Sequence, residues 1–421
     1  MSDTHGLNRR DFLKAGVAGA AGALLGSELG FPAIVRAAKV KDPIKIGCQG
    51  IMSGPLGGYG EYMKKGATLA MEEINSKGGV LGSKIELNFR DDELKPDVGV
   101  KNARFFVDDW GADFLIGIDS SGVAMAVGQV MPELNKILIV THAATEKYNE
   151  GLVYQKKIKQ CFRVCVPTYQ DGIASAHVAK NLPVKTWATV SPDYEYGYTS
   201  WKMFKHYLKD LRPDVEFVAE SWAKFGTADF SSHITKVMAA NPEGIFTTEW
   251  GGEAVSLVKQ AKLFKVFDQT KAWMNPMGSA MDVLQGLGKE YPEGAWVSGR
   301  YWFLYPDTAR NKAFVEAFRK RWNDYPPYVS ETSYTAVHAI KKAVEKAGTL
   351  DVSALIAALE GMELDRPAGK CVIRPEDHQA VYAVPWGQIT HDPKYTMPIL
   401  KNLKVFPVEE YYRKPPFPPI S

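Results

Sequence analysis

Ser120 and Ser121 stand where a predicted buried strand, residues 114–118, gives way to a helix that begins near residue 123. Backbone N–H groups at a helix N-terminus point outward, and together with the helix dipole and the serine hydroxyls they favour an anion. In open α/β sheets, ligands bind at the carboxyl ends of parallel strands. The pair therefore predicts a seat for a ligand carboxylate, although serine is also a residue type that simply caps a helix.

A hydrolase is the competing interpretation of this sheet edge, with His142 as base and Ser120 or Ser121 as nucleophile. The sequence contains no G-x-S-x-G, H-E-x-x-H or G-x-x-x-x-G-K-[ST] motif, and its eight histidines are scattered singly. The glycine-rich loop of residues 54–60 does not match the G-x-G-x-x-G fingerprint of dinucleotide sites. We therefore interpret His142 as a residue that lines a cleft, and we predict no enzyme, no cofactor and no metal site.

Length and composition indicate a globular protein of more than one domain. The chain has 421 residues, 45% of them hydrophobic, and a formal charge of +3. This length predicts two or more packed domains with sizeable cores, and the nearly balanced charge excludes a strongly basic nucleic-acid binder.

The first 37 residues have the pattern of an export signal. A charged start with the motif Arg9-Arg10-Asp11-Phe12-Leu13-Lys14 precedes the small and apolar run of residues 15–25, and Val35-Arg36-Ala37 predicts cleavage before Ala38. The motif closely resembles the twin-arginine signal, whose pathway exports folded proteins. We expect a mature chain that lies in the periplasm and does not insert into the membrane.

Four cysteines remain in the mature chain: Cys48, Cys161, Cys165 and Cys371. On one strand Cys161 and Cys165 would lie about 13 Å apart, too far for a disulfide. The spacing does not specify any other pairing, and we favour buried thiols over a zinc site because no C-x-x-C is present.

From Ile44 onward, short apolar runs alternate with amphipathic stretches of helical length, which indicates β-α-β units and parallel sheets. The first lobe has predicted strands at 44–48, 84–90, 114–118 and 137–140 and helices at 60–76, 98–109 and 123–134. The pattern restarts after Pro167, with predicted strands at 186–190, 215–220, 244–248 and 272–275 and helices at 171–181, 199–211, 231–240 and 253–264. The fold class is therefore α/β, with two doubly wound parallel-sheet lobes.

After this second lobe, the regular alternation of predicted strands and helices ends. A strand at 295–302 is followed by helices at 310–322, 332–347 and 353–359, without enough strands for a third sheet. We expect these helices to return and pack on an earlier lobe. Residues 405–421 contain five prolines, which predicts an extended, loosely attached tail.

The order and spacing of several motifs resemble one family over residues 44–390. These motifs are Ile44-Lys-Ile-Gly47 with Met52-Ser-Gly-Pro55, the segment from Gly66 to Gly79, Asp91-Asp92, Gly117-Ile-Asp-Ser-Ser121, and Asp193 with Tyr196-Gly197. The chain resembles the periplasmic solute-binding proteins of branched-chain amino-acid-type ABC importers, the leucine/isoleucine/valine-binding protein family. The resemblance implies a type I periplasmic binding fold, in which three crossover segments join the lobes, here near residues 163–167, 295–301 and 369–374.

This resemblance assigns residue ranges to the lobes. The implied division is a signal peptide at 1–37, lobe 1 at 38–162, lobe 2 at 163–298, returning helices of lobe 1 at 299–368, and completion of lobe 2 with the tail at 369–421.

The same resemblance implies roles for individual residues. Positions matching Ser121, Ala143 and Thr145 hold the ligand carboxylate in the family, with Ser120 beside them. Tyr59 matches an aromatic residue that shields the ligand, and Tyr196 matches a tyrosine of the cleft.

The second lobe departs from the family at Met277. In the amino-acid binders this turn carries a glutamate that pairs with the ligand's ammonium, so its absence weakens an amino-acid assignment. Glu249 is a candidate substitute if its side chain turns inward. Trp250 corresponds approximately to an aromatic position near the ligand amine, and an ordinary surface ring is the alternative for it.

The implied function is a receptor that closes like a hinge on a small carboxylate and delivers it to an inner-membrane ABC permease. The expected ligand is an apolar or aromatic carboxylic acid, which we favour, or a branched-chain or aromatic amino acid. A ligand-sensing receptor subunit for amides or related molecules is the alternative.

Overall fold

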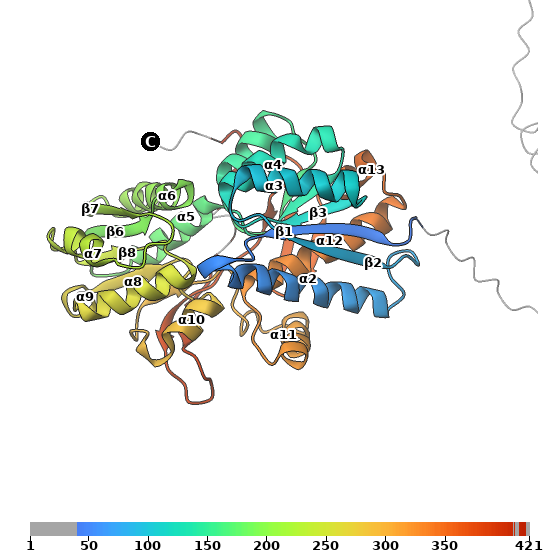
Figure 1. Cartoon of the computed structure of the whole chain (residues 1–421). Coiled ribbons are helices and arrows are strands. Elements are labelled where there is room, and N and C mark those ends of the chain that lie inside the picture. Colours follow the sequence, from blue (N-terminus) through green and yellow to red (C-terminus); the bar gives the residue numbers. More distant parts are fainter. Residues whose placement is uncertain (1–39, 407, 409–411, 418–421) are drawn as a thin grey trace, which may run out of the picture. The chain divides into compact units, whose positions relative to one another are not determined.

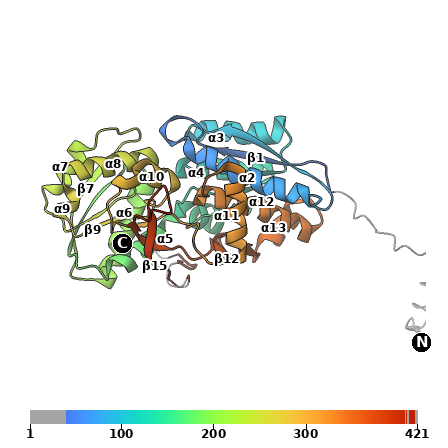
Figure 2. The same cartoon turned by 90° about the horizontal axis from the view of Figure 1, so that it is seen from below.

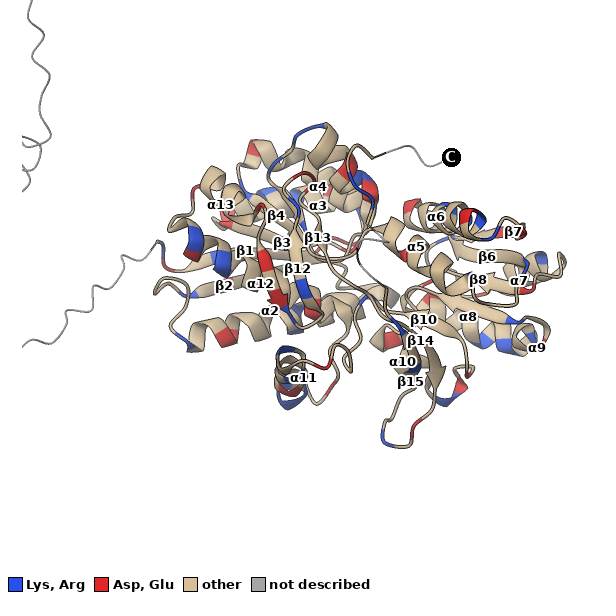
Figure 3. Ribbon diagram, turned by 180° about the vertical axis from the view of Figure 1, so that it is seen from behind, with Lys and Arg blue, Asp and Glu red and all other residues tan. Residues whose placement is uncertain are grey.

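The computed structural model describes residues 40–406, 408 and 412–417 (Figure 1). The signal peptide expected at 1–37 lies outside these residues. Within the described part, no helix is long and apolar enough to cross a membrane. Lys and Arg lie interspersed with Asp and Glu along the helices of Figure 3, in keeping with the formal charge of only +3.

The first lobe is built on a five-stranded parallel sheet in the order β2-β1-β3-β4-β5. Its strands are β1 Ile44–Gly50, β2 Ile85–Asp91, β3 Phe114–Gly117, β4 Ile137–Val140 and β5 Cys161–Arg163. Its helices are α2 Gly58–Ser76, α3 Pro96–Arg104 and α4 Ser121–Leu134, with π-helical segments at Phe105–Asp109 and Lys147–Gln155. Strands β3 and β4 are buried along their whole length, which explains their continuous apolar sequences.

The second lobe has a seven-stranded sheet in the order β15-β14-β10-β9-β8-β6-β7. Its strands are β6 Thr186–Pro192, β7 Glu216–Ala223, β8 Gly244–Phe246, β9 Ala272–Asn275, β10 Trp296–Ser298, β14 Trp386–Thr390 and β15 Ile399–Lys404. Its helices are α5 Thr168–Ala179, α6 Glu195–Leu211, α7 Ser231–Met238, α8 Gly251–Leu263, α9 Val266–Gln269 and α10 Met281–Leu287. The antiparallel strands β14 and β15 were not predicted, because they lie in a polar and proline-containing stretch without clear alternation.

The late helices are α11 Ala309–Trp322, α12 Tyr328–Ala347 and α13 Val352–Leu359. Helix α12 packs on α2 of the first lobe, as Figures 1 and 2 both show, so the predicted return of the late helices is confirmed. The approach is close at Gly66, where a Cβ would lie 2.1 Å from the carbonyl oxygen of Ser330. Only glycine permits this contact between the two helices.

A small antiparallel sheet follows, made of β11 Glu363–Arg366, β12 Gly369–Ile373 and β13 Ala380–Val381. The sequence placed the third crossing near 369–374, but those residues form β12 of this small sheet. The chain joins the seven-stranded sheet only at β14, so the third crossing is residues 382–385. The other two crossings leave β5 and β10, at 164–167 and 299–308. The residue ranges assigned to the lobes stay a prediction.

The tail is attached more firmly than the sequence suggested. Tyr412 is buried in the core of the second lobe, where its hydroxyl donates to Gln170 Oε1 at 3.0 Å and accepts the Tyr382 N–H at 3.3 Å. A single aromatic residue in a proline-rich tail therefore supplies an anchor that composition did not reveal. The four cysteines are buried and carry free thiols.

Candidate functional site

A cavity lies among loops that follow the carboxyl ends of strands from both sheets. Both lobes and the second crossing contribute to its lining. The lining residues are Tyr59, Asp119, Ser121, His142, Ala144, Tyr194, Tyr196, Trp250, Met277, Arg300 and Tyr328. A position between the strand ends of two sheets is typical of a small-molecule site.

Residues from both predicted halves of the site meet here. Tyr59 and Ser121 come from the first lobe, and Tyr196, Trp250 and Met277 come from the second. Ser121 begins α4, Tyr196 lies in the first turn of α6, and Trp250 immediately precedes α8. Each occupies the junction of a strand and a helix, which is why the positions are close in space although they are distant in sequence.

Four predicted site residues do not line the cavity. Ser120 is the N-cap of α4, and its carbonyl oxygen accepts the Ala124 N–H. The Ala143 N–H is bonded to the carbonyl oxygen of Ile118, and the neighbouring Ala144 lines the cavity instead. The hydroxyl of Thr145 accepts the Lys147 N–H at 3.3 Å.

Glu249 is the fourth of these residues. Its side chain is buried outside the cavity lining, and its backbone carbonyl accepts a hydrogen bond from Asn275 Nδ2 at 3.0 Å. Burial, with Glu253 nearby, raises the pKa of the Glu249 carboxyl well above its ordinary value. The structure therefore does not present Glu249 as a replacement for the glutamate missing at Met277.

Arg300 is the main residue of the site that the sequence analysis missed. It follows β10, is only 3% exposed, and has a φ of 61°, a left-handed conformation uncommon for a residue with a side chain. Its Nη2 donates to Asp171 Oδ2 at 2.5 Å and its Nη1 donates to the carbonyl oxygen of His142 at 3.2 Å. Its Nε has no partner among the described residues. A permanently charged group with a free donor is thus held in the lining of the cavity.

Aromatic rings form much of the wall. The rings of Tyr59 and Trp250 meet edge to face with centroids 4.7 Å apart, and Tyr328 lies 6.3 Å from Tyr59. The Arg300 guanidinium is 5.5 Å from the ring of Tyr196 and 5.6 Å from that of Tyr328. These surfaces suit a flat or apolar ligand body.

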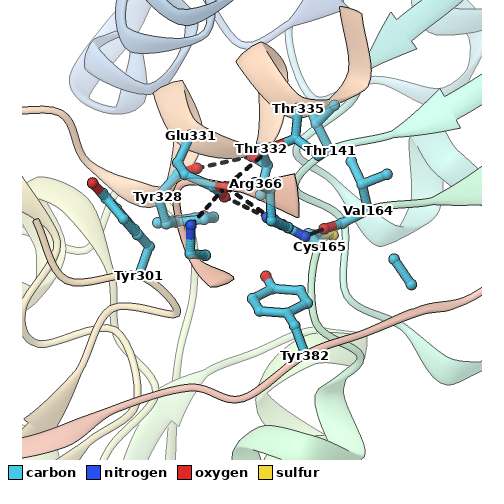
Figure 4. A network of polar contacts seen from close by, with 12 residues as sticks. Thr141, Val164, Cys165, Tyr301, Tyr328, Glu331, Thr332, Thr335, Arg366 and Tyr382 are labelled. Carbon is cyan, nitrogen blue, oxygen red and sulfur yellow. Dashed lines mark hydrogen bonds and ion pairs between the residues drawn. The ribbon is translucent and has the colours of Figure 1, made fainter. Parts of the chain in front are cut away.

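The helix that carries Tyr328 also takes part in a buried polar network. Glu331, one turn further along α12, forms an ion pair with Arg366, whose Nη1 also donates to the carbonyl oxygen of Val164 at 2.7 Å in the first crossing (Figure 4). The Arg366 guanidinium lies 3.9 Å from the ring centroid of Tyr382 in the third crossing. The network connects two crossings to the helix that carries Tyr328.

Asp119 and His142 form a second polar group in the lining. Asp119 Oδ1 lies 3.2 Å from His142 Nδ1, and both side chains are almost fully buried. Burial lowers the pKa of His142 to about 3, so the imidazole is neutral at physiological pH. Burial also raises the pKa of Asp119 well above its ordinary value.

Some signals for the missed residues were present in the sequence. Arg300 lies inside the predicted strand at 295–302, in a segment that was expected to be a crossing. Asp119 lies inside the quoted motif of residues 117–121, and Tyr194 is two residues from Tyr196. Tyr328 gave no such signal, because it reaches the cavity only through the packing of α12 on α2.

Two α/β lobes, three crossings and a cavity between the carboxyl ends of their strands define a protein of the solute-binding class. The chain belongs to the periplasmic binding protein family, whose model matches residues 43–394. A twin-arginine translocation signal matches residues 6–26, so the protein is exported to the periplasm. The family and the fold expected from the sequence are confirmed.

Curated relatives cover most of the chain. The Leu/Ile/Val-binding protein homolog 3 of Brucella melitensis is 29% identical over 75% of this chain and 82% of its own. The leucine-, isoleucine-, valine-, threonine- and alanine-binding protein of Pseudomonas aeruginosa is 26% identical over 78% of this chain and 85% of its own.

Solved structures share the fold. An ABC-transporter solute-binding protein of R. palustris in complex with 4-hydroxybenzoate has a TM-score of 0.79 and 23% identity, over 87% of this chain and 97% of that one. An ABC-type branched-chain amino acid transporter protein of Rhodopseudomonas palustris has a TM-score of 0.72 and 28% identity, over 88% of this chain and 98% of that one.

Proposed function

We propose that this protein is the solute-binding component of an ABC importer and that it closes on a small organic acid with an apolar or aromatic body. The observation that carries the proposal is Arg300, a buried guanidinium with a free Nε in a cavity walled by aromatic rings. The loaded receptor would then deliver the acid to an inner-membrane permease.

The position of the carboxylate follows from the donors available. Arg300, whose Nε is unpartnered among the described residues, and Ser121, which begins α4, both line the cavity. A guanidinium and a helix N-terminus each favour a negative charge. Asp171 already neutralises part of the Arg300 charge. The N-terminus of α4 would therefore add to the stabilisation of the ligand carboxylate. Thr145 was expected to donate from the side, but its hydroxyl is outside the lining.

The body of the ligand follows from the other side of the cavity. Met277 is 2% exposed and lines the cavity where the amino-acid binders have a glutamate. A thioether beside Trp250 and Tyr59 favours an apolar or aromatic surface. The two relatives are named for binding amino acids, and one of the solved structures holds 4-hydroxybenzoate. All of these ligands carry a carboxylate, which supports an acid as the ligand.

A binding screen tests the proposal. Calorimetry on the mature protein with 3-phenylpropionate, 4-hydroxybenzoate, phenylalanine, leucine and butyramide should show heat with at least one acid and none with the amide. Arg300→Gln should weaken that binding by about tenfold or more, whereas Arg321→Gln, which removes an equal charge at an exposed site on α11, should not. Binding of butyramide alone, or equal binding by Arg300→Gln, would contradict the proposal.

Closure of the lobes is tested separately. Solution scattering at saturating ligand should give a smaller radius of gyration than the unliganded protein. An unchanged profile with binding confirmed by calorimetry would indicate a rigid site.

A further inference from the structure

We propose that Asp119 accepts a hydrogen bond from a donor group on carbon 2 of the ligand, so that the protein selects 2-hydroxy or 2-amino acids over acids without this group. The inference rests on the proposed function, because it requires an acid in the cavity. It assigns a selectivity role to a residue of the first lobe.

One oxygen of Asp119 is fixed by the fold. Oδ2 accepts the backbone N–H of Ile51 at 2.8 Å, just after β1 ends. Gly50 makes room for it, since a Cβ at that position would lie 2.4 Å from Oδ2. The carboxyl group is therefore held against the first sheet and cannot turn without losing this bond.

The other oxygen, Oδ1, has no hydrogen-bond partner in the part of the chain that the structure describes. Its nearest polar neighbour is His142 Nδ1, at 3.2 Å. Whether this nitrogen can donate a hydrogen bond depends on the tautomer of the imidazole.

The surroundings of His142 determine the tautomer. Its Nε2 lies 3.2 Å from the carbonyl oxygen of Val329, and a carbonyl can only accept, so Nε2 carries the hydrogen. In a neutral ring Nδ1 is then an acceptor, and the Thr141 hydroxyl oxygen lies 3.0 Å from Nδ1 and 3.3 Å from Nε2. His142 therefore offers no hydrogen to Asp119 Oδ1.

An unsatisfied carboxyl oxygen in the lining of a binding cavity is best explained by a missing ligand donor. Buried polar groups that lack a partner are costly, and natural proteins rarely keep them without a function. The purely structural carboxyl of Asp113 contrasts with Asp119, since its oxygens bond both Lys41 and the Lys45 N–H.

The place of Asp119 also fixes the position of the donor on the ligand. Asp119 lies two residues before Ser121, and it contacts His142, whose carbonyl oxygen is bonded to Arg300. It is therefore on the side of the cavity that holds the carboxylate, which selects carbon 2 rather than the far end of the ligand. A hydroxyl and an ammonium can both donate this hydrogen bond, and an ammonium would find here a carboxyl group, which Met277 does not supply.

Two matched series of acids test the inference by calorimetry. The first is 3-phenylpropionate, 2-hydroxy-3-phenylpropionate, phenylalanine and 3-(4-hydroxyphenyl)propionate. The second is 4-methylpentanoate, 2-hydroxy-4-methylpentanoate and leucine. In the series that binds, we expect an acid with a donor on carbon 2 to bind about tenfold or more tightly than its unsubstituted counterpart. The member preferred, hydroxy or amino, identifies the donor.

Asp119→Asn is the variant to compare, because it keeps the shape of the side chain and an acceptor for Ile51. It should reduce the preference to about threefold or less, because its amide nitrogen would face the ligand donor. Asp113→Asn removes a carboxyl group of the same lobe outside the cavity lining and should leave the preference unchanged. Melting curves check that both variants are folded.

Three results would overturn the inference. They are equal binding of substituted and unsubstituted acids, a preference that survives in Asp119→Asn, and selection of only the acid with a hydroxyl on its ring. If no acid in either series binds, the proposed function itself fails, which is a distinct result from equal binding by all of them.

Discussion

Arg300 and Asp171 form a buried ion pair, with Nη2 2.5 Å from Oδ2, between the second crossing and the helix that follows the first crossing. The same guanidinium lines the ligand cavity. The site is thus connected to the second crossing and to the helix after the first crossing, which would move in the proposed closure of the lobes. Binding of an anion at Arg300 would act on two crossings at once.

Replacing Arg300 should lower both the affinity for the acid and the stability of the fold, and the two effects can be measured independently. Arg300→Gln should weaken acid binding by about tenfold to a hundredfold, because a hydrogen bond to a charged group is worth about 1.5 to 3 kcal/mol. It should also lower the free energy of unfolding by about 3 to 5 kcal/mol, because Asp171 is left buried without its positively charged partner. Urea unfolding and calorimetry measure the two effects. The double variant Arg300→Gln/Asp171→Asn should recover stability but not affinity, and recovery of both would contradict the role of Arg300.

Ser121 and Thr145 should differ in their effect on binding. Ser121 lines the cavity and Thr145 does not, so Ser121→Ala should weaken acid binding by about fivefold or more and Thr145→Ala should leave it within about twofold. Calorimetry of the two single variants decides this. A larger loss in Thr145→Ala would restore the role that the family resemblance implied.

The ion pair of Glu331 and Arg366 should contribute chiefly to stability. Both side chains are almost completely buried, so Glu331→Gln leaves an unpaired guanidinium and should destabilise the fold by about 3 to 5 kcal/mol. The double variant Glu331→Leu/Arg366→Met should recover most of that loss. Urea unfolding monitors both proteins, and a stable Glu331→Gln variant would show that the network is not needed.

The sequence predicted the two lobes because parallel strands and amphipathic helices leave strong periodic patterns. Ser121 was predicted from the junction of a strand and a helix, whereas Tyr59, Tyr196, Trp250 and Met277 were expected from the family resemblance, and all five line the cavity. The guanidinium of Arg300 was missed for a physical reason. A single arginine in a crossing has no periodic signal, and its position depends on a left-handed backbone and on the distant Asp171.

Asp92 should make stability depend on pH. Burial raises its pKa from 3.8 to about 6, so the folded protein keeps a proton that the unfolded chain loses between these values. The folded state therefore binds more protons, and the free energy of unfolding should fall as the pH rises from about 4 to 6. Asp92→Asn removes this contribution, up to about 2 to 3 kcal/mol. Urea unfolding at pH 4 and pH 7.5 for both proteins measures the difference, and identical pH profiles would contradict it.

The residue at position 277 should determine whether ligands with an ammonium group bind more or less tightly than those without one. It is buried in the cavity lining, so Met277→Glu introduces a carboxyl group facing the ligand. An amino acid then gains a partner for its ammonium, whereas the matching hydroxy acid or unsubstituted acid meets a second buried negative charge. The affinity ratio of phenylalanine to 3-phenylpropionate should rise by about tenfold or more, and calorimetry measures it.

Two control variants test whether the change comes from the charge at position 277 rather than from the size of the side chain, and whether Glu249 contributes. Met277→Gln has a similar volume without the charge and should not produce this change in ratio. Glu249→Gln should have little effect, because Glu249 lies outside the cavity lining. If Glu249→Gln abolishes amino-acid binding and Met277→Glu changes nothing, the anion comes from Glu249 after a movement of its side chain. Tight leucine binding by the wild type, with no binding of either unsubstituted or hydroxylated aromatic acids, would show that Met277 does not disfavour an ammonium.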